Sequence, residues 1–234
     1  MDYEARILTL SDNAVTVQFG ETIDPEINLR VQLAYKMINA SGIRGIIELV
    51  PTYRSLSVYY DPAELSLSAL KAEIEPLIKN IKASADERGE LIRIPVAYGG
   101  RYGEDLSRVA GLNGLSEQEV ISIHTEPEYP IYMLGFLPGF CYLGGMDKRI
   151  AAPRLATPRV KIAAGSVGIA GSQTGIYPID SPGGWQLIGR TPKKLYDPNR
   201  EKPILLEAGM RIKFYSIDEE EFLRISRLEG GDEP

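Results

Sequence analysis

The sequence has one cysteine, Cys141, and one histidine, His124, among its 234 residues. A single cysteine cannot form a disulfide within the chain, and a lone thiol is typical of a reducing compartment. A single histidine excludes a metal site built from several histidines. No apolar run approaches the roughly 20 residues of a membrane-spanning helix, and the start lacks the pattern of a signal peptide. We therefore expect a soluble, cytoplasmic protein.

The chain is also short of positive charge, with 26 Lys and Arg against 32 Asp and Glu and a net charge of −6. This balance disfavours a broad surface for nucleic acid or for an anionic membrane, and we expect neither partner. The common nucleotide-binding motifs are missing as well. No Gly-Lys pair occurs, which excludes a P-loop, and no G-x-G-x-x-G pattern is present. We therefore predict no nucleotide site by motif.

Glycine, by contrast, is abundant: the chain has 23, and seven of them fall within residues 160–192 together with the single tryptophan, Trp185. Glycines at this density indicate tight turns or a backbone that another group approaches closely. The sequence leaves both alternatives open. We expect these glycines to bend barrel strands and to let backbone amides approach a small anionic ligand.

The first part of the chain alternates between strand and helix patterns. A helix is predicted over residues 24–42, because Asp24 is placed as N-cap, Pro25 takes the first helical position and Gly42 follows as a stop. The expected strands are 4–9, 13–19, 45–50 and 54–60, and a second helix is expected over 65–82, kinked at Pro76. The order ββαββα predicts a small α/β sandwich.

The polar segment 82–90 marks the predicted domain boundary. Beyond it, a strand begins at Leu91 and two short helices follow, the second with a capping box formed by Ser116 and Glu119. From residue 129 onward Gly and Pro interrupt short β-type runs, which favours a barrel or a sandwich. We therefore predict an α+β fold with two domains, residues 1–88 and residues 89–234, and a frayed tail.

His124 ends the second of these short helices. It can be a helix-terminal histidine that bonds a free carbonyl group and is kept protonated by the helix dipole. It can also be a general acid, a general base or an anion ligand that faces the glycine-rich stretch. A Ser-His-Asp relay can be composed with Ser166 or Ser181 and with Asp180, but no nucleophile-elbow motif supports it.

Basic residues gather between positions 148 and 161, with Arg190 later in the chain, and give an acidic protein a local excess of positive charge. Arg154 and Arg159 belong to this group, and arginine binds carboxylates and phosphates with two parallel hydrogen bonds. The alternative is a solvated loop. Gln173 and Thr174, between two glycines, offer an amide and a hydroxyl to a polar ligand, or they form a tight barrel corner. Cys141 has apolar flanks, which indicate an inert buried thiol.

Four stretches carry a resemblance to a known family. They are "IIELVPTYRSLSVYYDP", "HTEPEYPIYMLGFLPGFCYLGGMD", "TPRVKIAAGSVGIAGSQTGIYPIDSPGGWQLIGRTP" and the segment from "LYDP" to "AGMRIKF", residues 195–214. They resemble the signature blocks of the allophanate hydrolase subunit 1 family, which includes the B component of 5-oxoprolinase and the sensor-kinase inhibitor KipI. Cys141 departs from the family pattern, which more often has proline or another small residue there.

The resemblance implies an N-terminal α/β domain and a C-terminal cyclophilin-like β-barrel. It implies a component of 5-oxoprolinase that is inactive alone and that acts with a homologous C component and with an A component. Such a complex uses ATP, with magnesium, to open 5-oxo-L-proline to L-glutamate. The alternative within the same family is a KipI-like protein that inhibits a sporulation sensor histidine kinase.

The resemblance also suggests which residues form the site. By similarity, the expected catalytic residues are His124 and Arg159. The expected substrate-binding residues are Arg154, Ser166, Gln173, Thr174 and Trp185. No metal ligands are expected in this chain.

Overall fold

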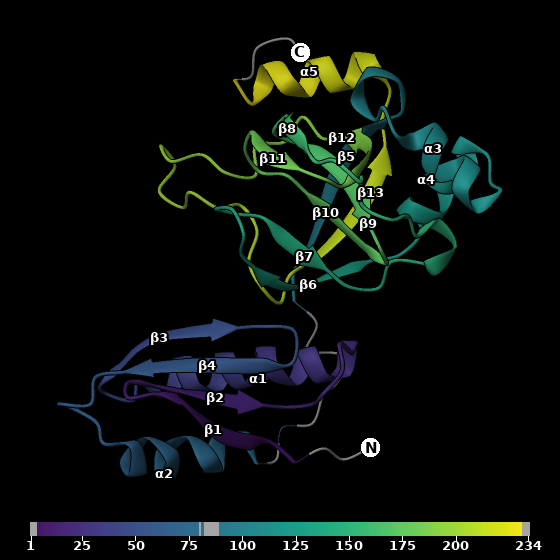
Figure 1. The fold of residues 1–234 in the computed structure, drawn as a ribbon. Helices are drawn as coiled ribbons and strands as arrows, with labels where there is room; N and C mark the ends of the chain where they lie inside the picture. The colour runs from purple at the N-terminus through teal and green to yellow at the C-terminus, as the bar shows by residue number, and fades with distance from the viewer. Residues whose placement is uncertain (1–3, 80, 82–88, 231–234) are drawn as a thin grey trace. The chain divides into compact units, whose positions relative to one another are not determined.

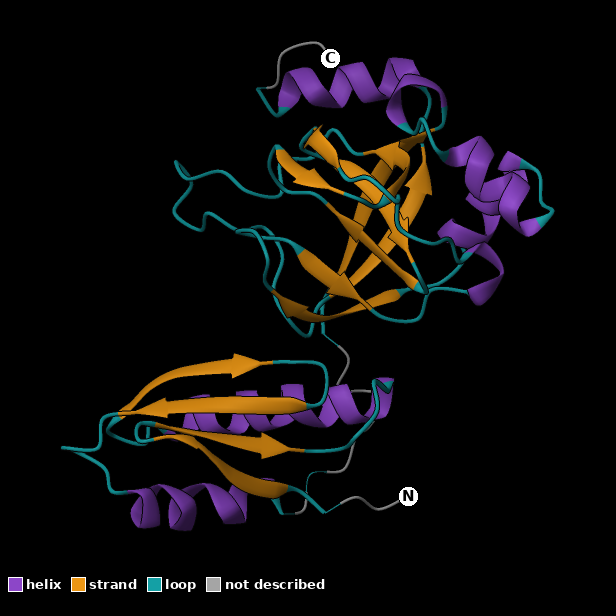
Figure 2. Ribbon diagram, viewed as in Figure 1, coloured by secondary structure: helices purple, strands orange, loops and turns teal. Residues whose placement is uncertain are grey.

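The computed structural model describes residues 4–79, 81 and 89–230 of the chain. Its contacts divide the chain into two compact units, Met1–Arg88 and Gly89–Pro234. Residues 82–88 of the predicted linker lie outside the described residues. The fold is mixed α/β, with a sheet in each unit and helices packed around it (Figures 1 and 2). That each unit folds as a separate domain stays a prediction.

The first unit is a four-stranded antiparallel sheet with two helices. Its elements are β1 (Arg6–Ser11), β2 (Ala14–Gln18), α1 (Pro25–Ser41), β3 (Ile46–Pro51), β4 (Ser55–Tyr60) and α2 (Leu67–Ile78). The sheet order is β1-β2-β4-β3. The predicted order ββαββα is therefore confirmed within the described residues.

Helix α1 shows why these residues fold as they do. The side chain of Asp24 accepts hydrogen bonds from the N–H groups of Glu26 and Ile27, at 2.8 and 3.2 Å, and so caps the helix. Gly42 ends it with a φ of 63°, a left-handed conformation that suits glycine. Val31 and Ile38, one face of the helix, are buried in the core cluster that includes the inner residues of the sheet.

The second unit is built around a seven-stranded sheet that nearly closes into a barrel. Its order is β10-β9-β12-β5-β13-β6-β7, and all neighbours are antiparallel except β5 and β13. A separate pair, β8 and β11, flanks it. The strands are β5 (Leu91–Tyr98), β6 (Tyr129–Leu134), β7 (Cys141–Leu143), β8 (Arg159–Ile162), β9 (Ser166–Ala170), β10 (Gln173–Ile176), β11 (Ser181–Gly183), β12 (Gln186–Arg190) and β13 (Arg211–Ser216).

The two edge strands of this sheet, β7 and β10, lie close together. A Cβ atom added to Gly175 in β10 would lie 3.2 Å from the carbonyl oxygen of Cys141 in β7. Helices α3 (Leu106–Asn113) and α4 (Glu117–Thr125) lie together on one side of the barrel, and α5 (Glu219–Leu228) lies at one end of it (Figure 1). Two 3₁₀ turns, Gly100–Tyr102 and Lys148–Ile150, belong to the same unit. The capping box of Ser116 and Glu119 is present at the start of α4, as predicted.

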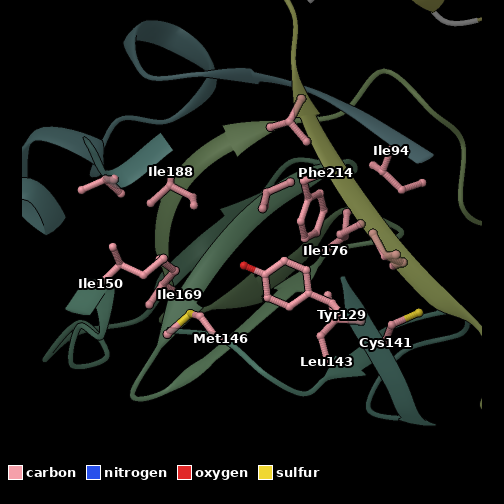
Figure 3. Close-up of a cluster of buried hydrophobic side chains, with 14 of the residues drawn as sticks. Ile94, Tyr129, Cys141, Leu143, Met146, Ile150, Ile169, Ile176, Ile188 and Phe214 are labelled. Atoms are coloured by element: carbon pink, nitrogen blue, oxygen red, sulfur yellow. The ribbon is translucent and has the colours of Figure 1, made fainter. Parts of the chain in front are cut away.

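Side chains fill the interior of the barrel. Figure 3 shows Tyr129 and Phe214 near its centre, with Ile94, Ile169, Ile176 and Ile188 around them. All of these side chains are almost fully buried in one core cluster. The barrel interior is therefore a packed core, as expected for a small barrel.

Helix α5 was not predicted, and the tail was predicted to be frayed. The side chain of Asp218 accepts a hydrogen bond from the N–H of Glu221 and caps the helix, and Phe222 and Ile225 are buried. Just beyond the helix, Glu229 forms ion pairs with two cations. The prediction of a frayed tail is therefore wrong for residues 227–230, and the last four residues lie outside the described part.

Candidate functional site

The predicted catalytic residue His124 lies inside the barrel unit and is fully buried. Its Nδ1 atom is 2.7 Å from the hydroxyl of Tyr98, and its Nε2 atom is 2.8 Å from Oγ1 of Thr174. The ring stacks on Phe214, with centroids 4.6 Å apart. The hydroxyl of Tyr129 donates to the backbone carbonyl of His124. Helix α4 is thus tied to the core through one polar side chain.

The directions of the hydrogen bonds between Tyr98, His124 and Thr174 follow from the bond that Thr174 makes to the backbone. The hydroxyl of Thr174 donates to the carbonyl oxygen of Gly168 at 3.1 Å. Because its one proton is used there, Oγ1 accepts from His124, which places the ring proton on Nε2. Nδ1 is then an acceptor, and Tyr98 donates to it. A neutral imidazole therefore satisfies every member of the network.

Burial lowers the pKa of His124 to about 3. The expectation that the helix dipole keeps this histidine protonated is therefore wrong, because desolvation outweighs the dipole in a dry core. The expected bond to a free carbonyl is also wrong, since both ring nitrogens contact side-chain hydroxyls. Catalysis by His124 stays a prediction that this geometry does not support.

The second predicted catalytic residue, Arg159, lies at the start of β8 and is held by two carboxylates. Its Nη2 atom is 2.9 Å from each carboxylate oxygen of Asp105, and its Nε atom is 2.9 Å from Oε1 of Glu104. Its Nη1 atom donates to the backbone carbonyl of Trp185. Asp105 also accepts the N–H of Leu187 at 2.6 Å. The charge of Arg159 is therefore already neutralised within the chain.

Three predicted residues gather around the phenol of Tyr177. Burial raises its pKa, and a hydrogen bond to the backbone of Trp185 and the charges of Arg154 and Arg159 partly offset this rise. Trp185 packs edge-on against Tyr177 and Phe140 and is only 6% exposed, so it belongs to a small aromatic core. Arg154 is exposed.

The remaining predicted residues lie on neighbouring strands. Ser166 is buried at the start of β9, where its carbonyl accepts the N–H of Tyr177. Gln173 is half-buried at the start of β10. The structure thus forms a pair from His124 and Thr174, and it groups Arg154, Arg159 and Trp185 elsewhere around Tyr177.

A cleft of about 890 Å³ lies outside the barrel interior, and none of the seven predicted residues lines it. Its walls are formed by residues 161, 164–165, 178–180, 190–194 and 196–199, together with two side chains of α5. The wall residues from 161 to 192 belong to the glycine-rich stretch. The size falls within the range of about 300–1,000 Å³ that is usual for small-molecule sites. This cleft is the candidate binding site.

The backbone at the base of the cleft needs glycine at position 165. Gly165 has a φ of 83°, and an added Cβ would lie 2.3 Å from the carbonyl oxygen of Thr191. Its N–H donates to the carbonyl of Tyr177, and its own carbonyl accepts the N–H of Thr191. Three segments of the stretch therefore cross here through main-chain contacts that any larger residue would prevent.

Four cationic side chains line the cleft, and two of them are paired. Nζ of Lys161 is 2.8 Å from Oδ2 of Asp180, whose Oδ1 accepts the N–H of Ala164. Nζ of Lys193 is 2.7 Å from Oε1 of Glu229. The other two are Arg190 and Lys194. Arg190 belongs to the basic group that the sequence indicates as a candidate anion site, although it was not assigned to the site, whereas Lys194 was not predicted. The segment "GRTPKK", three positive charges in an acidic chain, is the signal that could have indicated Lys194.

Within the described residues, no group of three or more His, Cys, Asp or Glu is placed to hold a metal ion. No helix of the described part is both long and apolar enough to cross a bilayer.

Comparison with known proteins identifies the family to which the chain belongs. The profile described as "Carboxyltransferase domain, subdomain C and D" matches residues 5–206. The chain therefore belongs to this carboxyltransferase-domain family. It is 45% identical to the B component of 5-oxoprolinase from Bacillus subtilis (strain 168), over 95% of this chain and 97% of that protein. It is 38% identical to the B component of 5-oxoprolinase from Escherichia coli O157:H7, over 90% of this chain and 95% of that protein. These relatives confirm the resemblance seen in the sequence.

Solved structures share the fold. The crystal structure of TTHA0988 matches with a TM-score of 0.78 and 37% identity over 88% of this chain, which spans only 40% of that protein. Protein PH0987 from Pyrococcus horikoshii is 47% identical, with a TM-score of 0.57, over 93% of this chain and 100% of that one.

Proposed function

We propose that this chain is the B component of an ATP-dependent 5-oxoprolinase, which opens 5-oxo-L-proline to L-glutamate together with the A and C components. The observation that carries the proposal is the 45% identity to the B component of 5-oxoprolinase from Bacillus subtilis over nearly the full length of both proteins. We propose a cytoplasmic location as well, because ATP is available there. We also propose that the barrel has the cyclophilin-like topology that the resemblance implies, without prolyl isomerase activity.

The chemistry of the reaction determines which groups the binding site must contain. A lactam is a poor electrophile, and transfer of a phosphoryl group from ATP to its carbonyl oxygen makes ring opening feasible. Such a step needs cations for the phosphoryl and carboxylate oxygens and donors for developing negative charge. The cleft described above offers cationic side chains and main-chain groups of this kind. Magnesium would enter with ATP as part of the substrate.

The chain by itself is proposed to be inactive. Its one histidine is buried and neutral, and its one cysteine is buried, which raises the pKa of the Cys141 thiol to about 12. Neither group is poised to exchange protons or attack a substrate at neutral pH. We therefore assign the chain a binding role and the chemical step to the assembled complex.

The alternative, a KipI-like inhibitor of a sensor histidine kinase, is not favoured. The relatives described above carry the name of the B component of 5-oxoprolinase, and no feature of the described surface points to a kinase. The two roles separate by experiment. Affinity purification of the tagged chain from its own cells should recover the A and C components. Recovery of a histidine kinase whose autophosphorylation the chain blocks, without these components, would overturn the proposal.

A further inference from the structure

Two of the four cations that line the cleft form no direct ion pair within the described residues. Arg190, half-buried at the end of β12, and Lys194 form no ion pair with any carboxylate in the described part of the chain. The charge of Arg190 helps to lower the pKa of Asp180, but that carboxylate is already bound by Lys161 and by the N–H of Ala164. Arg190 and Lys194 are therefore the two cations of the cleft that no carboxylate contacts directly within the described residues. The chain as a whole carries a net charge of −6 and repels anions. An anion is therefore attracted to positions such as Arg190 and Lys194, where positive charge is locally in excess.

Arg190 is also held in place before any ligand arrives. Its Nε atom donates to the carbonyl oxygen of Ala164 at 2.9 Å. This bond fixes one edge of the planar guanidinium and leaves both Nη groups without a described partner. A guanidinium with a free pair of N–H donors matches the two oxygens of a carboxylate or phosphate group. A side chain that is already oriented loses less entropy on binding.

We propose that this cleft binds a small molecule through an oxyanion, a phosphate or carboxylate group, and that Arg190 and Lys194 are its ligands. The identity of the molecule rests on the proposed function, since ATP and 5-oxoproline both carry such groups. The cleft volume of about 890 Å³ leaves room for a molecule of nucleotide size.

The test is direct binding to the purified full chain, measured by isothermal titration calorimetry with inorganic phosphate, ADP, ATP and 5-oxoproline. At least one probe should bind with one-to-one stoichiometry and more weakly at high salt. R190Q and K194Q should each weaken it by about tenfold, as expected for the loss of one charge-assisted contact. Binding of phosphate, ADP and ATP without 5-oxoproline identifies the phosphate source, and the reverse result identifies the carboxylate.

Two exposed cations outside the cleft serve as matched controls. R108Q in α3 and K148Q in the 3₁₀ turn Lys148–Ile150 remove the same kinds of charge and should leave binding unchanged. Lys194 has no described side-chain contact, so K194Q carries the test even where R190Q fails to fold. Equal loss in the control variants, or no binding of any probe, overturns the proposal. A chain that binds no probe while the complex turns over refutes the cleft site alone and leaves the proposed function standing.

Discussion

Arg159 and Asp105 form a two-pronged ion pair in which Nη2 is 2.9 Å from both carboxylate oxygens. Asp105 directly precedes α3, and its Oδ2 also accepts the N–H of Leu187 in β12. The pair therefore joins a helix to the barrel wall across the end of β8. All three guanidinium nitrogens of Arg159 already contact groups of the protein, which leaves few donors for a substrate. The catalytic role expected for Arg159 therefore stays a prediction that this geometry does not support.

Removal of the carboxylate should destabilise the fold. Asp105→Ala leaves the Leu187 N–H without a partner and takes two charge-assisted bonds from Arg159. We expect a loss of about 2–3 kcal/mol in the free energy of unfolding, measured by urea denaturation. Glu207→Ala, which breaks an exposed pair with Lys202, should change it little. Equal effects of the two variants would contradict the structural role.

The buried histidine should make stability depend on pH. The folded pKa of His124, about 3, lies below the unfolded value of about 6.5, so the unfolded chain binds the proton more readily. Stability should be complete above about pH 6.5 and fall by about 2 kcal/mol by about pH 5. His124→Gln should be nearly flat in this window, because the chain has no other histidine. Parallel slopes for both proteins in urea titrations would refute the buried neutral state.

Thr174 separates a structural role from the predicted substrate-binding role. Thr174→Val keeps the shape but leaves the buried His124 Nε2–H without a partner, which should cost about 1–3 kcal/mol of stability. Thr174→Ser keeps the hydroxyl and should cost less. In the assembled enzyme, the KM for 5-oxoproline should be the same for both variants. A rise in KM with valine but not with serine would instead support substrate binding by Thr174.

The thiol of Cys141 should be inert in the folded protein. Burial raises its pKa to about 12, and the side chain is fully buried in β7, so almost no thiolate is present at neutral pH. Ellman's reagent should react with it only after denaturation. Rapid reaction of the native chain, or loss of activity after alkylation under native conditions, would show that the thiol is accessible.

Local signals in the sequence were sufficient for much of the fold. Asp24 and Gly42 mark the two ends of α1, and Ser116 with Glu119 marks the start of α4, because caps act between residues close in sequence. Helix α5 was missed although Asp218 caps it in the same way. The helix spans only ten residues and follows a long region of short strands. A helix was therefore not expected at this place in the sequence.

The candidate site depended on contacts between distant residues. His124 is neutral because Tyr98 and Thr174, remote in sequence, enclose it, and no local pattern reports desolvation. The arginines were only partly informative: Arg159 is paired with Asp105, whereas Arg190, a member of the predicted basic group, forms no direct ion pair within the described residues. The glycine-rich stretch did indicate close backbone approach, and the structure places it at Gly165, at the base of the cleft.

The most direct test of the proposed role is the release of glutamate from 5-oxoproline by purified components. With ATP and magnesium, the A and C components together with this chain should produce glutamate and ADP in step, and omission of any one of the three should abolish both. This chain alone should be inactive. Full activity of the A and C components without this chain would contradict the account.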